Sequence, residues 1–152
     1  MKRAVIFILG VWVLSLLTMT ALSQERPESD TKTGTLIVSI VGFEDDRGDA
    51  RAELCKSPEE YKGERETFRR TVLPIKNGKV EWVLKDLPWG KYAVKAYHDK
   101  NANSILDKNA MGLPKEPYGF SNNARGFFGL PDYETVAFKF DQAVMTVPIT
   151  VK

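Results

Sequence analysis

From Thr71 to His98 the chain reads T-V-L-P-I-K-N-G-K-V-E-W-V-L-K-D-L-P-W-G-K-Y-A-V-K-A-Y-H, and this stretch decides the fold. Its β-branched and aromatic runs are broken by turn residues, which is typical of β-strands. Asn77-Gly78 is the dipeptide that best tolerates the positive φ angles of a type I′ hairpin turn, so we expect a strand on each side of it. Leu87 to Gly90 then reverses the chain into a strand whose alternate residues share a face.

The same pattern continues outward in both directions, and no segment has the period of a long helix. Residues 57–66 are charged and are predicted to form a loop or a single helical turn. We expect an all-β fold, a seven-stranded Greek-key two-sheet sandwich with one long metal-type loop. The predicted strands are Thr35 to Val41, Ala50 to Cys55, Phe68 to Ile75, Lys79 to Leu84, Tyr92 to His98, Glu134 to Phe140, and a last strand that places Met145, Val147, Ile149 and Val151 on one face.

The turn Leu87-Pro88-Trp89-Gly90-Lys91-Tyr92 has the form Leu-Pro-x-Gly-x-Tyr. It resembles a turn that recurs in transthyretin-like and related prealbumin-type sandwiches. The resemblance implies a prealbumin-like arrangement of the two sheets. Trp82 alternates with apolar neighbours on its strand and is assigned to the core, whereas Trp89 in the turn is expected to be exposed.

The N-terminal residues have the three parts of a secretory signal peptide. Met1-Lys2-Arg3 precedes an apolar run that ends at Leu17, and Ala21-Leu22-Ser23 forms a small-residue cleavage site. The apolar run is shorter than the roughly 20 residues that cross a bilayer. We therefore expect residues 1–23 to be a signal peptide, residues 24–33 a flexible N-terminal tether, and residues 34–152 a single β-sandwich domain. The protein would be exported to the periplasm or the medium, without membrane insertion after cleavage.

Composition restricts the partners of the exported chain. The 22 basic and 20 acidic residues give a formal net charge of +2, and removal of Lys2 and Arg3 leaves 20 of each. A neutral chain with scattered cations has no electrostatic footprint for nucleic acid and no basic amphipathic helix for a membrane surface. An unknown protein or glycan ligand is the remaining class of partner. Cys55 is the sole cysteine, so no internal disulfide can form, and we expect it to be a small apolar residue on a strand.

About 35 residues separate the strand that ends near His98 from the one that begins near Glu134. Unstructured loops of this length are uncommon in compact domains and are usually functional or disordered. Five aromatic residues argue against a solvated coil. We expect them to pack as a small core of the loop, and a platform for a sugar or peptide is the alternative. They are Tyr118, Phe120, Phe127, Phe128 and Tyr133.

The start of this loop, from His98 to Asn109, reads H-D-K-N-A-N-S-I-L-D-K-N. Calcium takes six to eight oxygen ligands, and the loop follows the spacing of an EF-hand with Asp99 in the first position. Ser104 stands at the sixth position, where glycine is usual, and Ala110 at the twelfth, where a bidentate carboxylate is usual. Glu116 is the nearest carboxylate that can complete the shell. The predicted calcium ligands are Asp99, Asn101, Asn103, the carbonyl of Ile105, Asp107 and Glu116. The alternative is a series of Asx turns without an ion.

The stretch from His98 to Ala124 continues as A-M-G-L-P-K-E-P-Y-G-F-S-N-N-A after Asn109. It resembles the signature H-D-x-N-x-N-G-x-L-D-x-N followed by G-x-P-x-E-x-Y-G-F-S-N, which marks an uncharacterised bacterial family of secreted proteins, a domain of unknown function. The resemblance implies a fold and a motif but no reaction. It also implies that Glu116, Tyr118, Ser121 and Asn122 belong to the same site as Asp99.

Two enzymatic interpretations compete with a binding or structural role. A hydrolase would pair Ser121 with His98 and an acid, but no G-x-S-x-G nucleophile elbow is present. His98 is the sole histidine, and we expect it to position the loop by a hydrogen bond rather than to bind zinc or act as a base. The leading hypothesis is a non-enzymatic protein whose calcium loop rigidifies a binding or structural surface. A small hydrolase, or a glycan-binding module that uses Tyr118, Phe120 or Trp89, is the alternative.

Overall fold

The computed structural model describes residues 31–126 and 129–152. The predicted signal peptide, most of the predicted tether, and Phe127 and Phe128 lie outside the described residues. None of the helices in the described part has the length and apolar character that a bilayer crossing needs. The strands are β1 (Thr33–Val41), β2 (Asp49–Cys55), β3 (Arg69–Pro74), β4 (Lys79–Pro88), β5 (Gly90–Asp99), β6 (Tyr118–Phe120), β7 (Phe138–Phe140) and β8 (Val144–Thr150). The helices are α1 (Pro58–Lys62), the 3-10 turn η1 (Ser121–Asn123) and α2 (Tyr133–Val136).

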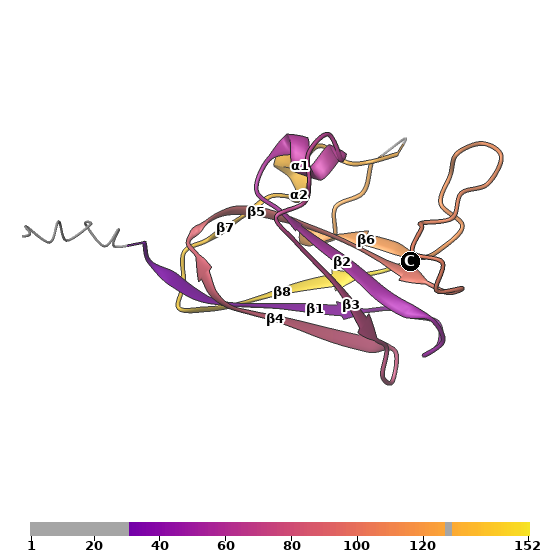
Figure 1. The fold of residues 1–152 in the computed structure, drawn as a ribbon, viewed down its shortest axis with the longest axis horizontal. Helices are drawn as coiled ribbons and strands as arrows, with labels where there is room; N and C mark the ends of the chain where they lie inside the picture. The colour runs from indigo at the N-terminus through magenta and orange to yellow at the C-terminus, as the bar shows by residue number, and fades with distance from the viewer. Residues whose placement is uncertain (1–30, 127–128) are drawn as a thin grey trace, which may run out of the picture. The chain divides into compact units, whose positions relative to one another are not determined.

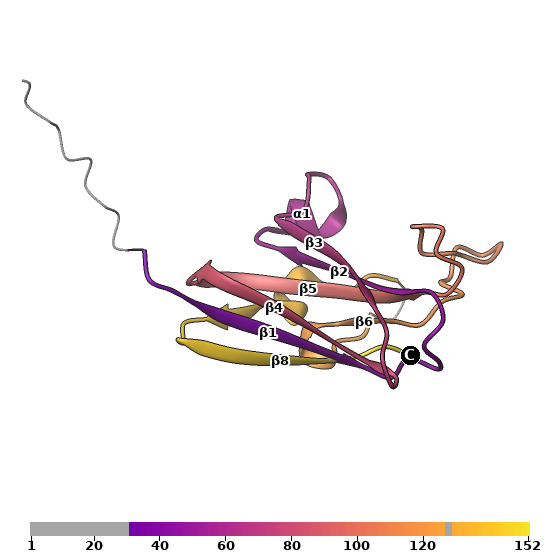
Figure 2. The ribbon, with the colours of Figure 1, turned by 60° about the horizontal axis from the view of Figure 1, so that its bottom comes forward.

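The strands form two sheets that face each other (Figure 1). One sheet has three strands in the order β4-β1-β8. The other has five, in the order β3-β2-β5-β6, with β7 paired to the first residues of β5. Neighbouring strands are antiparallel except for β1 and β8, which are parallel. Figure 2 shows the sheets as two layers, and the predicted all-β sandwich is confirmed at this level.

The described residues contain eight strands, so the predicted number of seven is wrong. The additional strand is β6, which lies inside the predicted long loop and pairs with β5 through Tyr97 and Tyr118. A strand of three residues is too short to show the alternation on which the prediction relied. The loop is therefore interrupted by a strand, and its continuous unstructured part ends before Tyr118.

The strand predicted from Glu134 to Phe140 is also wrong in its first half. Residues 133–136 form the helical turn α2, and only the last part is strand β7. Val136 packs with Tyr133 in one apolar cluster, whereas Phe138 and Phe140 pack in the core between the sheets. On a continuous strand, Val136, Phe138 and Phe140 would all point to the same face. The helical turn α2 changes the direction of the chain, so Val136 can pack in one cluster and Phe138 in the other.

The Asn77-Gly78 turn has the predicted geometry. Asn77 has φ 53° and Gly78 has φ 68°, and two positive angles are what a type I′ turn requires. The flanking strands do not remain paired, because β3 pairs with β2 and β4 pairs with β1. A single bridge between Lys76 and Lys79 holds the turn, which therefore joins the two sheets at a corner.

The core lies between the two sheets and is built from alternate residues of the long strands. Leu36, Val38 and Ile40 of β1 are fully buried and face Val94 and its neighbours on β5. Trp82 belongs to this core, as expected, and Trp89 is 37 % exposed.

A second apolar cluster covers part of the outer face of the five-stranded sheet. Cys55 and Ala93, which point away from the main core, pack there against Tyr61 of α1 and against Phe120 and Tyr133. Two aromatics of the predicted loop therefore pack as expected. Helix α1 is held in place by sequence signals: Ser57 caps its first turn, Pro58 begins it, and Gly63 ends it in the left-handed conformation.

Candidate functional site

Asp99 is the last residue of β5 and anchors the loop that follows it. Its side chain is fully buried, and Arg51 of β2 donates from Nε to Oδ2 at 2.5 Å. The backbone N–H of Ser104 donates to the same oxygen at 2.8 Å, and that of Asn103 donates to Oδ1 at 3.0 Å. Burial opposes ionisation of Asp99, but these hydrogen bonds outweigh it together and hold the pKa of the carboxyl below its usual range. Asp99 is thus a carboxylate at neutral pH.

The side chains of Asn101, Asn103 and Asp107 converge above Asp99. Oδ1 of Asn101 accepts from the N–H of Asn103 at 3.1 Å, and Oδ1 of Asn103 accepts from the N–H of Ile105 at 2.8 Å. Their amide groups donate to the carboxylate of Asp107, at 2.8 Å from Asn101 and 3.3 Å from Asn103. The side chain of Ile105 is exposed, as a position that would contribute only its carbonyl allows. The structure therefore brings together the residues at the first, third, fifth and ninth positions of the predicted EF-hand-like loop.

Glu116 closes the loop from its far end. The side chain is 6 % exposed, and its two oxygens accept from the N–H of Lys100 at 2.8 Å and from the N–H of Asp107 at 3.0 Å. A carboxylate oxygen has a second lone pair, so each oxygen of Glu116 keeps one acceptor site. The structure therefore places Glu116 beside the other predicted ligands, where it braces the backbone.

The loop backbone includes left-handed residues and is packed closely at its base. Ala102 has φ 54° and Ser104, at the position where glycine is usual in this type of loop, has φ 72°. Gly48, in the turn between β1 and β2, has φ 67°, and a Cβ there would lie 2.0 Å from the carbonyl oxygen of Asp99. The base of the loop consequently fits against the β1–β2 turn with no room for a side chain.

The donors near the loop are carboxylates and amides. In residues 31–126 and 129–152, no group of three or more histidine, cysteine, aspartate or glutamate side chains is placed to hold a metal ion. A cation in this loop would therefore need the amide oxygens of Asn101 and Asn103 and backbone carbonyls in addition to carboxylates. Such oxygen ligands suit calcium and do not suit zinc, which prefers nitrogen and sulfur.

His98 lies next to Asp99 in sequence but points to the other side of the sheet. It is fully buried, its ring packs edge-on against Phe43 with centroids 5.3 Å apart, and Nε2 is 2.7 Å from the carbonyl oxygen of Arg47. A hydrogen bond to a carbonyl requires the proton on Nε2. Among the described residues, Nδ1 has no partner. The ring of His98 thus fixes the β1–β2 turn and not the loop that follows Asp99, which it was expected to position.

Ser121 and Asn122 lie at a different part of the sheet. Ser121 is fully buried; its hydroxyl donates to the carbonyl of Val136 at 2.6 Å and accepts from the N–H of Val94 at 2.9 Å. Asn122 donates to backbone carbonyls of the α2 segment. Val94 precedes His98 by four residues, which is about 13 Å along a strand. The structure does not bring Ser121 and His98 together, and it separates both Ser121 and Asn122 from the loop.

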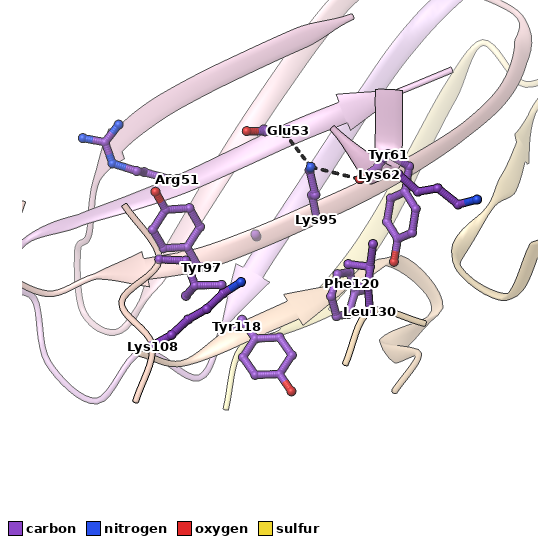
Figure 3. A pocket seen from close by; sticks show the side chains of 12 residues that line it. Arg51, Glu53, Tyr61, Lys62, Lys95, Tyr97, Lys108, Tyr118, Phe120 and Leu130 are labelled. Atoms are coloured by element: carbon purple, nitrogen blue, oxygen red, sulfur yellow. Dashed lines mark hydrogen bonds and ion pairs between the residues drawn. The ribbon is translucent and has the colours of Figure 1, made fainter. Parts of the chain in front are cut away.

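A pocket of about 430 Å³ lies beside the loop, on the outer face of the five-stranded sheet (Figure 3). Helix α1 lies at one end of it, and Leu106 and Lys108 of the loop lie at the other. Sequence reasoning missed this pocket because outward residues of β2 and β5 look like an ordinary solvated face. The available signal was the gathering of cations and aromatics on that face: Arg51, Glu53, Lys95 and Tyr97 on the long strands, with Tyr118 and Phe120 on β6.

Comparison with known proteins gives a family and no closer relative. A search of curated proteins and a search of solved structures each found no match. A family model described as "Uncharacterized protein conserved in bacteria (DUF2141)" matches residues 38–148. The match spans both sheets and the whole loop, and it covers well over half of the chain. The expected membership of an uncharacterised bacterial family is confirmed, and the chain belongs to the family DUF2141.

Proposed function

We propose that the loop from Asp99 to Glu116 binds one calcium ion, and that the protein is an exported, non-enzymatic sandwich in which this ion rigidifies a binding surface. The observation that carries the proposal is the convergence of Asp99, Asn101, Asn103 and Asp107 at alternate positions of a nine-residue segment. Asx turns alone account for the hydrogen bonds of Asn101 and Asn103. Asx turns do not require the carboxylate of Asp107 at the ninth position. They also do not require Glu116, whose carboxylate binds the backbone N–H groups of Lys100 and Asp107.

The charge balance of the loop predicts weak calcium binding. Oδ2 of Asp99 already accepts from Arg51 and from the N–H of Ser104, and Oδ1 accepts from the N–H of Asn103. Only the second lone pair of Oδ1 is left for an ion. Arg51 also offsets one negative charge. Because calcium affinity follows the number of ligand charges and the rigidity of the site, we expect a dissociation constant of about 10⁻⁴–10⁻³ M, the range of extracellular modules.

The role in binding rests on the position of the loop. Leu106 and Lys108 line the pocket on the outer face of the sheet, so an ion that fixes the loop also fixes one wall of the pocket. A non-enzymatic role is supported by the separation of Ser121 from His98 and by the hydrogen bonds that Ser121 makes to backbone groups. The prealbumin-like arrangement belongs to the same proposal, since the turn at residues 87–92 carries the chain from one sheet to the other.

Export is the remaining part of the proposal. It rests on the basic, apolar and small-residue parts of residues 1–23. The exported chain would begin at Gln24, which the mass of the purified protein reports.

A thermal melt of the purified protein tests the calcium site. At about 10 mM calcium, an ion with the expected affinity stabilises the folded state by roughly 1.4–2.7 kcal/mol, which raises Tm by roughly 5–10 °C over EDTA. The same concentration of magnesium should give a smaller shift, because magnesium demands octahedral geometry and dehydrates reluctantly.

A matched pair of variants locates the site. Asp107→Asn removes one ligand charge at nearly constant shape, and we expect it to reduce the calcium-dependent shift by half or more. Asp86→Asn makes the same change at an exposed residue of the three-stranded sheet and should leave the shift unchanged. A calcium shift that is absent, or that is equal in the two variants, would show that Asx turns hold the loop without an ion.

A further inference from the structure

The pocket beside the loop is lined by six segments of the chain, one of which contributes Leu130 alone. Its floor is the outer face of β2 and β5, one side is β6, and the ends are α1 and the loop. Figure 3 shows Tyr97, Tyr118 and Lys108 at the loop end of the pocket, with Lys95 nearer to α1. The volume of about 430 Å³ lies in the range of small-molecule sites, which is about 300–1,000 Å³.

The charged residues of the pocket are mostly basic. Arg51, Lys62, Lys95 and Lys108 line it together with one acid, Glu53. Glu53 is already engaged, since it accepts from Nζ of Lys95 at 2.9 Å and from the hydroxyl of Thr67 at 2.9 Å. The chain as a whole is close to neutral, with a formal net charge of +2 over 152 residues. Arg51 is paired with the buried Asp99 and Lys95 with Glu53, so Lys62 and Lys108 carry the excess positive charge of the pocket. Excess positive charge in a concave surface attracts ligands of negative charge.

Several hydrogen-bond donors in the pocket are available. An ammonium has three N–H donors, and Lys95 uses two of them, toward Glu53 and toward the carbonyl of Tyr61 at 3.1 Å. Lys108 has no side-chain hydrogen bond or ion pair among the described residues, and its ammonium lies between Tyr97 and Tyr118 in Figure 3. The hydroxyl of Tyr97 is also without a hydrogen bond in the part of the chain that the structure describes. A phenol hydroxyl can donate a hydrogen bond as well as accept one, so Tyr97 can donate to an anion in the pocket.

The other walls are aromatic and aliphatic. Tyr118 and Phe120 pack edge-on with ring centroids 5.7 Å apart, and Leu106 of the loop lies near them. Such walls bury the flat face of a ring. At the α1 end the hydroxyl of Tyr61 is buried and has no hydrogen-bond partner among the described residues. Buried polar groups are nearly always paired in native proteins, so an unpaired donor in a pocket points to a polar group of a ligand.

We infer that this pocket binds a small organic anion in which a carboxylate is attached to a ring. The carboxylate accepts from Lys95, Lys108 and the hydroxyl of Tyr97, and the ring lies against Tyr118 and Phe120. The inference names a ligand class for the surface that the proposed calcium loop borders, and it rests on the proposed function only for the fixed position of Lys108. Sugar acids and aromatic acids share this chemistry.

Calorimetric titration of the purified protein with two acids tests the inference and shows whether the ligand is a sugar acid or an aromatic acid. The probes are digalacturonate and benzoate, and their neutral counterparts are the dimethyl ester of digalacturonate and benzamide. We expect at least one acid to bind, and its neutral counterpart to bind about tenfold more weakly, because charge-assisted hydrogen bonds are lost. Binding of digalacturonate identifies a sugar acid as the ligand class, and binding of benzoate identifies an aromatic acid.

Matched lysines in one loop connect binding to the pocket. Lys108→Ala should weaken binding of the acid about threefold to fivefold, which is the range for one exposed ion pair. Lys115→Ala removes the same charge from an exposed lysine that does not line the pocket, and should have no effect. Tyr97→Phe removes only the hydroxyl and should weaken binding while leaving Tm unchanged, since the hydroxyl makes no hydrogen bond within the described residues.

Each titration is run in calcium and in EDTA. Binding of an acid with these variant effects supports the inference even where no calcium shift is found, and only the proposed calcium site then fails. A calcium shift without binding of either acid overturns the inference and leaves the calcium site intact. Equal binding of acid and neutral counterpart, or equal effects of Lys108→Ala and Lys115→Ala, also overturns it.

Discussion

At the scale of single residues, two glycines with similar backbone angles have very different surroundings. Gly48 has φ 67° and Gly63 has φ 79°, so alanine in either position adopts an unfavourable left-handed conformation. At Gly63 a Cβ would meet nothing within 4 Å, whereas at Gly48 it would lie 2.0 Å from the carbonyl oxygen of Asp99. The pair separates the cost of backbone conformation from the cost of lost space.

We predict that Gly63→Ala lowers the free energy of unfolding by about 1 kcal/mol, the cost of a left-handed alanine. Gly48→Ala should lower it by about 2–4 kcal/mol, because the backbone of the loop must also move. Urea unfolding measures both values, and the calcium-dependent shift in Tm should shrink only in Gly48→Ala. If Gly48→Ala and Gly63→Ala lower the free energy of unfolding equally, the close contact between the β1–β2 turn and the base of the loop does not contribute to stability.

The buried carboxylate of Asp99 predicts how stability depends on pH. Its pKa is lower in the folded chain than in the unfolded chain, because Arg51 and two backbone N–H groups bind the ionised form more strongly than burial opposes it. A group of this kind contributes stability above its unfolded pKa of about 4, and the contribution is lost as the pH falls through the folded pKa. The protein should therefore lose stability on acidification below about pH 4.

Asp99→Asn is the variant that reports on this group. It should be less stable than the natural chain at pH 7, and the difference in Tm between the two should narrow as the pH falls from 5 to below 4. Asp86→Asn, a change at an exposed carboxyl, serves as the control and should follow the natural chain at every pH. A constant difference between Asp99→Asn and the natural chain would exclude Asp99 as a source of the acid sensitivity.

At the scale of elements, the corner between β3 and β4 depends on a contact from another loop. The carboxylate of Asp46 accepts from the N–H groups of Asn77 and Gly78, each at 2.8 Å, and so ties the β1–β2 turn to the hairpin turn. Because β3 and β4 separate into different sheets directly after this turn, little else holds it.

We predict that Asp46→Ala lowers the free energy of unfolding by about 1 kcal/mol, the typical net value of such hydrogen bonds at an exposed site, and Tm by roughly 3–5 °C. Glu81→Ala removes an exposed carboxylate from the middle of β4 and should change Tm little. Amide exchange of Asn77 and Gly78 should become faster in Asp46→Ala only. Unchanged exchange would show that the type I′ geometry alone protects the turn.

Much of the fold could be predicted because local chemistry and the final structure agree. Asn77-Gly78 encodes its turn in two residues, and the alternation of β1 and β5 encodes which face is buried. The short elements β6 and α2 could not be predicted, since their conformation is set by partners distant in sequence: Tyr97 for β6, and the cluster around Tyr61 for α2. The spacing of the Asp99 loop could be recognised because its residues are close in sequence, whereas the pocket depends on residues from six separate segments.

At the scale of the whole molecule, the five-stranded sheet has different surroundings at its two ends. Near α1 and α2 its outer face is covered by the second apolar cluster. Toward the loop the same face is open and lined by cations and aromatics. The covered end and the two-sheet core thus hold most side chains of the pocket in place, whereas the loop is held by hydrogen bonds to the carboxylates of Asp99 and Glu116. An ion in the loop would act where the framework is weakest.

The parallel pairing of β1 with β8 also constrains when the protein can fold. Thr35 is the partner of Val144, and Val41 is the partner of Thr150, so the central strand of the three-stranded sheet lies beside a strand 109 residues further along the chain. Contacts between residues so far apart in sequence form slowly, because a long loop must close first. A chain that leaves the ribosome N-terminus first therefore cannot complete its sandwich until residues 144–150 have emerged. The order of synthesis thus delays closure of the three-stranded sheet until β8 is available.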